Sequence, residues 1–233
     1  MADLSNPDRA VVLVSGGLDS AILLRFVHQR LGMREIYALS FLYGQKHQRE
    51  LACAEYQTKQ CPAVRDWQVV DIGVLGTLTA GASALTDGTI AVPELQDIPE
   101  GERTQPITYV PNRNMIMLSL AAAYAESHGC RTVYYGAQAQ DEYGYWDCTS
   151  TFVTRLNAVL GLNRRQSITI AAPFTGKRKA EEIKLGLELG VDFAHTWSCY
   201  RGGERPCGVC PSCSERQKAF AEAGLADPAL GLG

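Results

Sequence analysis

Short apolar runs alternate with amphipathic segments along most of this chain. The first run, Ala10-Val11-Val12-Leu13-Val14, is continuous and rich in β-branched residues, which is typical of a buried strand. The next segment, from Asp19 to Gln29, carries its apolar residues at helical spacing, and Gly32 is a suitable residue to end that helix. The chain therefore opens with a strand, a tight turn and a helix.

The same patterns predict the remaining elements. Strands are expected at 9–14, 35–43, 67–72, 132–136 and 168–170, and helices at 19–29, 47–59, 112–127, 150–160, 179–189 and 214–223. Strands and helices that alternate at short intervals favour a parallel sheet with helices on its faces. We therefore expect an α/β fold with a Rossmann-like parallel sheet.

Residues Gly73 to Thr108 break this alternation. The stretch is rich in Gly, Thr, Pro and Asp and has little periodicity, so it is predicted to be an insertion or a lid. A second polar loop runs from Gln138 to Asp147. We expect a catalytic domain over residues 1–198 and a small cysteine-containing unit with a final helix, packed on it, over residues 199–233.

Composition narrows the class of protein. Of 233 residues, 46% are apolar and 20% charged, as in a globular domain with a core that needs no disulfides. The net charge of −3 disfavours direct binding to nucleic acid, and no apolar run is long enough to cross a membrane. The first residues show no signal-peptide pattern, so we expect a cytoplasmic protein.

The turn after the first strand, Ser15-Gly16-Gly17-Leu18-Asp19-Ser20, predicts a phosphate-binding loop. The two glycines let successive backbone N–H groups point at one anion, and the helix N-terminus adds further donors and partial positive charge. Asp19 would repel a bare phosphate, so its expected partner is a Mg²⁺ ion that bridges phosphates. The alternative is a plain glycine turn with Asp19 or Ser20 as the helix N-cap.

Four of the eight cysteines, Cys199, Cys207, Cys210 and Cys213, fall within fifteen residues. Glycines and prolines between them allow a short loop to bend each sulfur towards one centre. Four thiolates suit tetrahedral zinc in a structural role, with no position left for water. Free thiols, two disulfides and an iron–sulfur cluster are the alternatives.

The hexapeptide resembles the signature of PP-loop (N-type) ATP pyrophosphatases, which cleave ATP between its α and β phosphates. Four further stretches complete a pattern: Phe41-Leu42-Tyr43-Gly44-Gln45-Lys46-His47, Val110-Pro111-Asn112-Arg113-Asn114, Gly144-Tyr145-Trp146-Asp147-Cys148 and Lys179-Ala180-Glu181. With the cysteine tail, this ordered set resembles the 7-cyano-7-deazaguanine (preQ0) synthase family from about Ala10 to Arg216. Each short piece is weak alone, but the set is specific.

The resemblance implies an adenine nucleotide alpha hydrolase type of fold and an ATP-dependent ligase. That ligase would convert 7-carboxy-7-deazaguanine and ammonia to preQ0 through adenylated carboxylate and amide intermediates, in queuosine biosynthesis. It also implies ATP, Mg²⁺ and Zn²⁺ as cofactors and a homodimer as the assembly.

Site residues follow from the matched motifs. Catalysis is assigned to Asp19, Arg113 and Lys179, and nucleotide binding to Val14, Ser15, Gly16, Gly17, Leu18, Asp19, Ser20 and Tyr43. Substrate contacts are assigned to Gln45, His47, Asn114, Asp141, Tyr145 and Asp147, and metal binding to the four cysteines. Each has a plainer alternative: Lys179 can begin an exposed helix, His47 can simply start one, and the tyrosines can be packing residues.

Two residues depart from the family pattern. Trp146 stands where members usually carry Pro, and Thr149 where they usually carry Arg, on either side of a stretch expected to contact the substrate. This motivates an alternative, a paralogous PP-loop ligase that couples a related carboxylate to a different amine. A third hypothesis is a zinc-stabilised nucleotide-binding module without catalysis.

Overall fold

The centre of the molecule is a parallel sheet of five strands in the order β3-β2-β1-β4-β5. The computed structural model describes residues 8–46, 49–98, 106–138 and 144–229. The strands are β1 (Arg9–Leu13), β2 (Glu35–Leu42), β3 (Val64–Asp71), β4 (Thr132–Tyr134) and β5 (Thr169–Ala171). The predicted α/β class with a parallel sheet is confirmed.

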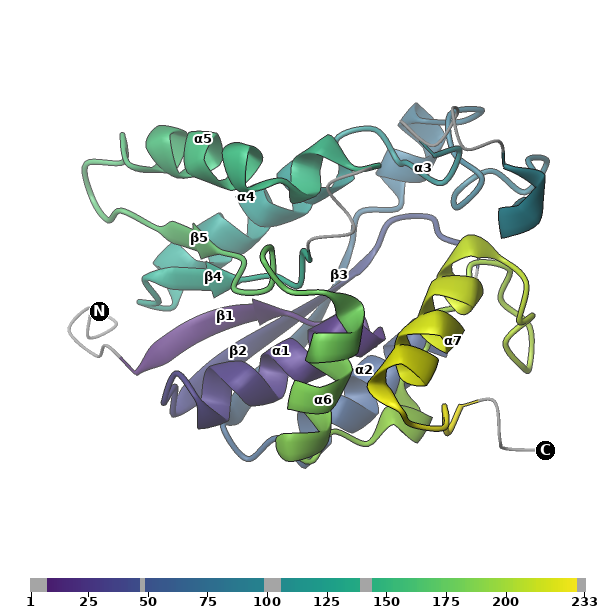
Figure 1. Cartoon of the computed structure of the whole chain (residues 1–233). Coiled ribbons are helices and arrows are strands. Elements are labelled where there is room, and N and C mark those ends of the chain that lie inside the picture. Colours follow the sequence, from purple (N-terminus) through teal and green to yellow (C-terminus); the bar gives the residue numbers. More distant parts are fainter. Residues whose placement is uncertain (1–7, 47–48, 99–105, 139–143, 230–233) are drawn as a thin grey trace.

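Helices cover both faces of the sheet (Figure 1). One face carries α4 (Arg113–Ser127) and α5 (Ser150–Leu160), and the other carries α1 (Leu18–Gln29), α2 (Arg49–Gln60), α6 (Lys179–Glu188) and α7 (Pro211–Ala223). The first strand serves both cores, because alternate side chains of a strand point to opposite faces. Ala10 and Val12 pack with α1 and α6, whereas Val11 packs with α4 and α5.

The strand order places a crevice at the carboxyl ends of β1 and β4. From β1 the chain continues to β2 and β3 on one side, while β4 and β5 lie on the other side. Ligands of open parallel sheets bind where the strand order reverses in this way. The predicted phosphate loop follows β1 directly and therefore lies at this point.

Among the element boundaries that differ from the prediction, three have a clear physical reason. The strand β3 begins at Val64, ahead of the predicted start, because it is an edge strand whose polar residues interrupt the apolar pattern. Helix α7 begins at Pro211 instead of residue 214, since proline is well suited to the first helical position. The short β5 is shifted by one residue, and the Asn157 side chain hydrogen-bonds both backbone groups of Ile170.

The insertion after β3 is largely irregular and packs against the cysteine loop. It contains α3 (Val74–Leu78) and a short 3₁₀ helix, η1 (Leu95–Asp97). The Arg201 guanidinium donates to the Val92 carbonyl at 3.0 and 3.2 Å, and the Leu95 N–H donates to the Val209 carbonyl at 3.2 Å. Its role as a lid remains a prediction.

The C-terminal unit shares the core of the rest of the chain. Phe220 of α7 lies in the same hydrophobic cluster as α1 and α6. Buried Arg216 holds Asp227 through hydrogen bonds of 2.7 and 2.9 Å. The predicted boundary between a catalytic domain that ends at residue 198 and a cysteine-containing unit that begins at residue 199 therefore stays a prediction. Among the described helices, none is long and apolar enough to cross a membrane.

Candidate functional site

A cavity of about 280 Å³ opens at the carboxyl ends of the strands. The structure brings most of the predicted site residues to its wall. From the predicted set, the lining residues are Val14, Ser15, Gly17, Leu18, Asp19, Ser20, Tyr43, Gln45, Arg113, Asn114, Tyr145 and Lys179. Segments that lie far apart in the sequence therefore meet at one site.

The phosphate loop is closed by its own serines. The Gly16 N–H donates to Ser20 Oγ and the Gly17 N–H to Ser15 Oγ, both at 3.2 Å, and Ser20 Oγ donates to the Gly17 carbonyl at 3.0 Å. Gly17 is the N-cap residue of α1, and no side chain caps that helix. The alternative of Asp19 or Ser20 as an N-cap is therefore wrong, and the first turn keeps free donors for an anion.

Gly16 is the tightest point of the loop. Its φ is 88°, and a Cβ placed there would lie 1.9 Å from the Glu50 carbonyl oxygen. Its own carbonyl accepts a hydrogen bond of 3.0 Å from the Trp197 N–H. The loop is thus held between the start of α2 and the segment that leads into the cysteine loop.

An ion-pair cluster occupies one side of the cavity. Lys179 Nζ lies 3.6 Å from Asp19 Oδ2 and 4.0 Å from Glu215 Oε2, with the lysine side chain only 11% exposed. The alternative of an exposed Lys179 is therefore wrong. Asp19 Oδ1 is buried and finds no hydrogen-bond partner among the described residues, so this hard oxygen fits a Mg²⁺ ion.

Arg113 and Tyr43 form the other side. The Arg113 guanidinium lies over the Tyr43 ring, 5.4 Å from its centroid, and donates to the Tyr43 hydroxyl at 3.4 Å. Burial raises the pKa of Tyr43, so its hydroxyl stays protonated. The Gln45 side chain accepts from the Tyr43 N–H at 2.7 Å and donates to the Phe41 carbonyl at 3.1 Å, which fixes the turn after β2.

Residues 106–114 and 144–149 form a unit beside the cavity that we call the aromatic wall, and it lines the cavity through Arg113, Asn114, Tyr145 and Cys148. The Tyr145 hydroxyl lies 2.7 Å from Thr108 Oγ1 and the ring faces the cavity. Asp147 is 2% exposed and lies behind the lining, where Oδ2 accepts the Asn114 N–H at 3.2 Å. Burial raises its pKa. Asp147 therefore holds the start of α4.

Trp146 and Thr149 are not among the described residues that line the cavity. Trp146 is 45% exposed and its Nε1 donates to the Tyr109 hydroxyl at 2.7 Å. Thr149 is the N-cap of α5 and accepts the Phe152 N–H at 3.1 Å. Both stabilise local structure. His47 and Asp141, predicted to contact the substrate, lie outside the described residues.

Several residues that line the cavity were not predicted from the sequence motifs. Glu50 lies in the first turn of α2, and Glu215 follows the last cysteine by two residues. Trp197 and Tyr200 also face the cavity from the start of the cysteine loop. A glutamate at a helix start is normally read as a favourable helix-dipole residue, so sequence alone gave no reason to single it out.

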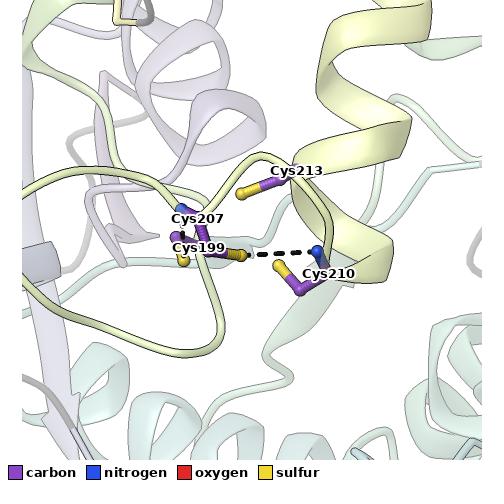
Figure 2. Close-up of side chains that lie close together, drawn as sticks. All are labelled: Cys199, Cys207, Cys210 and Cys213. Atoms are coloured by element: carbon purple, nitrogen blue, oxygen red, sulfur yellow. Dashed lines mark hydrogen bonds between the residues drawn. The ribbon is translucent and has the colours of Figure 1, made fainter. Parts of the chain in front are cut away.

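The four cysteines form one cluster, with their sulfurs pointing towards one another (Figure 2). All four sulfur atoms lie within 4.8 Å of one another. Tetrahedral zinc with bonds of about 2.3 Å places its sulfurs about 3.8 Å apart, and the spacing of this cluster is compatible with that geometry. The Cys207 N–H donates to Cys199 Sγ and the Cys210 N–H to Cys207 Sγ, both at 3.4 Å, which would stabilise thiolates.

The parallel sheet and the phosphate loop at its reversal point define a nucleotide-binding α/β protein of the PP-loop type. Two solved structures share the fold. The NMN synthetase from Francisella tularensis has a TM-score of 0.50 and 14% identity, covering 95% of this chain and 80% of that one. The U34-tRNA thiolase NcsA from Methanococcus maripaludis, with its [4Fe-4S] cluster, has a TM-score of 0.50 and 13% identity, covering 94% and 65%.

Sequence comparisons identify the family within this class. The model of the queuosine biosynthesis protein QueC matches residues 9–224. Proteins named 7-cyano-7-deazaguanine synthase are 44% identical in Clostridium kluyveri, covering 94% of this chain and 96% of that protein, and 45% identical in Thermoplasma acidophilum, covering 94% and 90%. The chain belongs to the QueC family. The predicted family and the class of ATP-dependent ligase-type enzyme are confirmed, so a non-catalytic module is excluded.

Proposed function

We propose that this chain converts 7-carboxy-7-deazaguanine and ammonia to 7-cyano-7-deazaguanine, with cleavage of two ATP to AMP and pyrophosphate. The observation that carries the proposal is one cavity, in a QueC-family chain, with a phosphate loop and Lys179 on one side and Arg113 and Tyr43 on the other. The proposal places the nucleotide phosphates and the flat purine-like ring of the substrate together in this cavity.

The chemistry explains the need for ATP. A carboxylate is a poor electrophile because its oxygen is a poor leaving group. Attack of that oxygen on the α phosphorus releases pyrophosphate, and ammonia then displaces AMP to give an amide. A second adenylation, on the amide oxygen, allows that oxygen to leave with AMP, so the nitrile forms without an external oxidant or reductant.

The phosphate side of the cavity would manage the charge that develops in both adenylations. Backbone N–H groups of the phosphate loop and the serine hydroxyls would bind the phosphates, as anions bind at helix N-termini. Lys179 and Arg113 would neutralise negative charge on the reacting phosphates from opposite sides. Asp19 would hold Mg²⁺, which supplies further charge neutralisation when bound.

The ring of the substrate would lie on the opposite side of the cavity. Tyr43 and Tyr145 offer aromatic faces for stacking, and Asn114 offers an amide at the cavity wall. Gln45 and Asp147 would act indirectly, because their side chains hold the turn after β2 and the start of α4. Roles for His47 and Asp141 in substrate binding remain predictions.

The cysteine cluster would hold zinc in a structural role. Four thiolates saturate a tetrahedral ion, and the proposed reaction contains no redox step, which favours zinc over an iron–sulfur cluster. The homodimer, the cytoplasmic location and the lack of direct nucleic-acid binding also remain predictions. Light scattering on the purified protein would test the first.

The direct test combines purified protein, ATP, Mg²⁺, ammonia and 7-carboxy-7-deazaguanine. We expect about two AMP for each nitrile formed, measured by chromatography and mass spectrometry, as the scheme requires. Lys179→Met should abolish AMP release, whereas Lys184→Met, on the exposed side of the same helix, should not change it. Metal-loaded protein that forms neither AMP nor nitrile would contradict the proposal.

Nothing in the comparisons favours the alternative function, a paralogous ligase that uses a different amine. Trp146 and Thr149 were the reason to consider that function, and neither residue lines the cavity. The same assay separates the two functions. Release of AMP that depends on 7-carboxy-7-deazaguanine, with no amide or nitrile even at high ammonia concentration, would favour that ligase.

A further inference from the structure

Three carboxylates line the described part of the cavity, and one of them differs from the others. Asp19 and Glu215 both lie within 4.0 Å of Lys179. Glu50 is the third, and no described residue forms a hydrogen bond or an ion pair with its side chain. The whole Glu50 carboxylate is therefore available to a ligand, whereas Asp19 and Glu215 each already have Lys179 beside one oxygen, and the other Asp19 oxygen is assigned above to Mg²⁺.

Backbone packing places Glu50 next to the phosphate loop. Its carbonyl oxygen lies so close to Gly16 that no Cβ fits between them. The side chain reaches the cavity from the first turn of α2, on the side of Arg113 and Tyr43. Glu50 thus borders both the phosphate loop and the part of the cavity assigned above to the substrate ring.

The proposed reaction creates a need for such a group. Ammonia enters with three N–H bonds, and the nitrile nitrogen has none. One proton leaves when nitrogen bonds to the acyl carbon and the C–O bond to AMP breaks. A second leaves when the amide oxygen is adenylated. The third leaves when the second C–O bond breaks and the C≡N bond forms. While the adenylate is intact, its singly ionised phosphate oxygens are weak bases, so a base on the cavity wall has a clear task.

We propose that Glu50 is the proton acceptor for the nitrogen atom during conversion of the acyl adenylate to the nitrile. This assignment rests on the proposed function. In each step the carboxylate takes one proton from nitrogen while the electron pair of that N–H bond moves into the C–N bond or stays on nitrogen. The protonated side chain then returns its proton to solvent before the next step, so no further reagent is needed.

The electrostatic surroundings suit this task. Burial raises the pKa of Glu50 to about 7, while the Arg113 guanidinium opposes that rise. The other titratable groups that sense Glu50 are Tyr43 at the end of β2 and Cys53 on its own helix, and burial keeps both in the neutral form. A general base works best when its pKa is close to the pH at which the enzyme operates.

The experiment compares Glu50→Gln with Glu55→Gln, in full-length, metal-loaded protein. Glu55 lies on the same helix, outside the cavity, and pairs with Lys59. Two readouts are needed. Exchange of labelled pyrophosphate into ATP, dependent on 7-carboxy-7-deazaguanine and measured without ammonia, reports adenylation alone. Amide and nitrile formation with ammonia reports the proton-transfer steps.

We expect Glu50→Gln to keep pyrophosphate exchange within about twofold and to lose about 100-fold or more in nitrile formation. The ratio of wild-type to Glu50→Gln rates should rise with pH through about 7 and then level off. This ratio cancels the titration of ammonium, which affects both proteins. Glu55→Gln should match the wild type in both assays.

Two results would overturn the assignment. One is nitrile formation by Glu50→Gln at the wild-type rate. The other is an equal loss of exchange and nitrile formation, which would place Glu50 in ATP binding or in the fold. Failure of the proposed function is a separate outcome, because the wild type itself would then show no carboxylate-dependent exchange.

Discussion

The phosphate loop and the aromatic wall face each other across one cavity but are built in different ways. The loop is a contiguous hexapeptide, and its expected ligand groups are backbone N–H donors and short side chains held by hydrogen bonds within the loop. The aromatic wall joins two separate segments through side chains, such as Tyr145 with Thr108 and Trp146 with Tyr109. One wall depends on local conformation, and the other depends on long-range pairing.

This difference has a consequence for how each wall responds to change. A backbone site tolerates almost no alteration where the chain is close-packed, because a backbone cannot rotate away from an added atom. A wall of side chains can lose one contact and retain the others. Substitutions near Gly16 should therefore be costly, and substitutions near Trp146 should be mild.

The largest expected effect comes from the cysteine cluster that supports the loop side. Cys213→Ser should lower the free energy of unfolding by more than about 4 kcal/mol, because loss of the proposed structural metal would remove the link that orders the cysteine loop. Nucleotide binding should weaken too, since Trp197 holds Gly16 from this loop. Metal content and thermal unfolding measure both effects.

Cys61→Ala is the control for that substitution. Cys61 is a buried thiol in the main core, away from the cluster, and should cost only about 1 kcal/mol with full metal content. A Cys213→Ser protein that retains one metal per chain and the wild-type melting temperature would contradict the predicted role of the cluster.

The second effect tests the backbone of the loop. Gly16→Ala should cost about 3 kcal/mol or more and abolish ATP binding, because the new Cβ would overlap the Glu50 carbonyl in addition to straining the backbone. Gly32→Ala is a matched control, with a φ of 74° and no atom near its Cβ position, and should cost about 1 kcal/mol. Equal losses in denaturant titrations would show that the close contact has no energetic effect.

The third effect concerns stability against pH. The pKa of Glu50 is raised from 4.5 to about 7 on folding, so between these values the folded protein binds more protons than the unfolded chain. Its stability therefore falls as pH rises through this window. Glu50→Gln should raise the free energy of unfolding by about 3 kcal/mol at pH 8, with less than about 1 kcal/mol of gain at pH 5. Urea titrations of this variant and of Glu55→Gln at both pH values provide the measurement.

The smallest effect belongs to the aromatic wall. Trp146→Phe removes the hydrogen bond to Tyr109 but retains an aromatic ring near Phe152. We expect a loss of about 1 kcal/mol or less in stability and less than a threefold change in kcat/KM. A double-mutant cycle with Tyr109→Phe isolates the pair energy. A tenfold change in kcat/KM would mean that Trp146 contacts the substrate after all.

Sequence patterns predicted the fold well where one signal was strong. The apolar run of β1 and the helix after the glycine turn were located within a residue of their ends. The prediction of element boundaries failed where tertiary packing, and not the local apolar pattern, determines where a strand begins. Val64 opens an edge strand, where polar side chains face solvent, so the pattern did not mark the start of β3.

The site shows the same division. The residues of one contiguous loop were enough to predict phosphate binding. In contrast, the sequence did not indicate which residues Trp146 and Thr149 contact. Proximity to Asp147 suggested a substrate contact, but a turn sends successive side chains in different directions. Trp146 lies partly exposed against Tyr109, and Thr149 caps a helix.

The sequence by itself determined the parallel sheet, the phosphate loop, the cysteine cluster and the family, because each depends on residues close together in the chain or on a motif order. Only the tertiary structure decided which side chains face the cavity. It brought Glu50 and Glu215 to the wall, paired Lys179 with Asp19, and turned Asp147 towards the start of α4. These outcomes depend on packing between segments that lie far apart in sequence, and no local pattern encodes the direction of a side chain across such a contact.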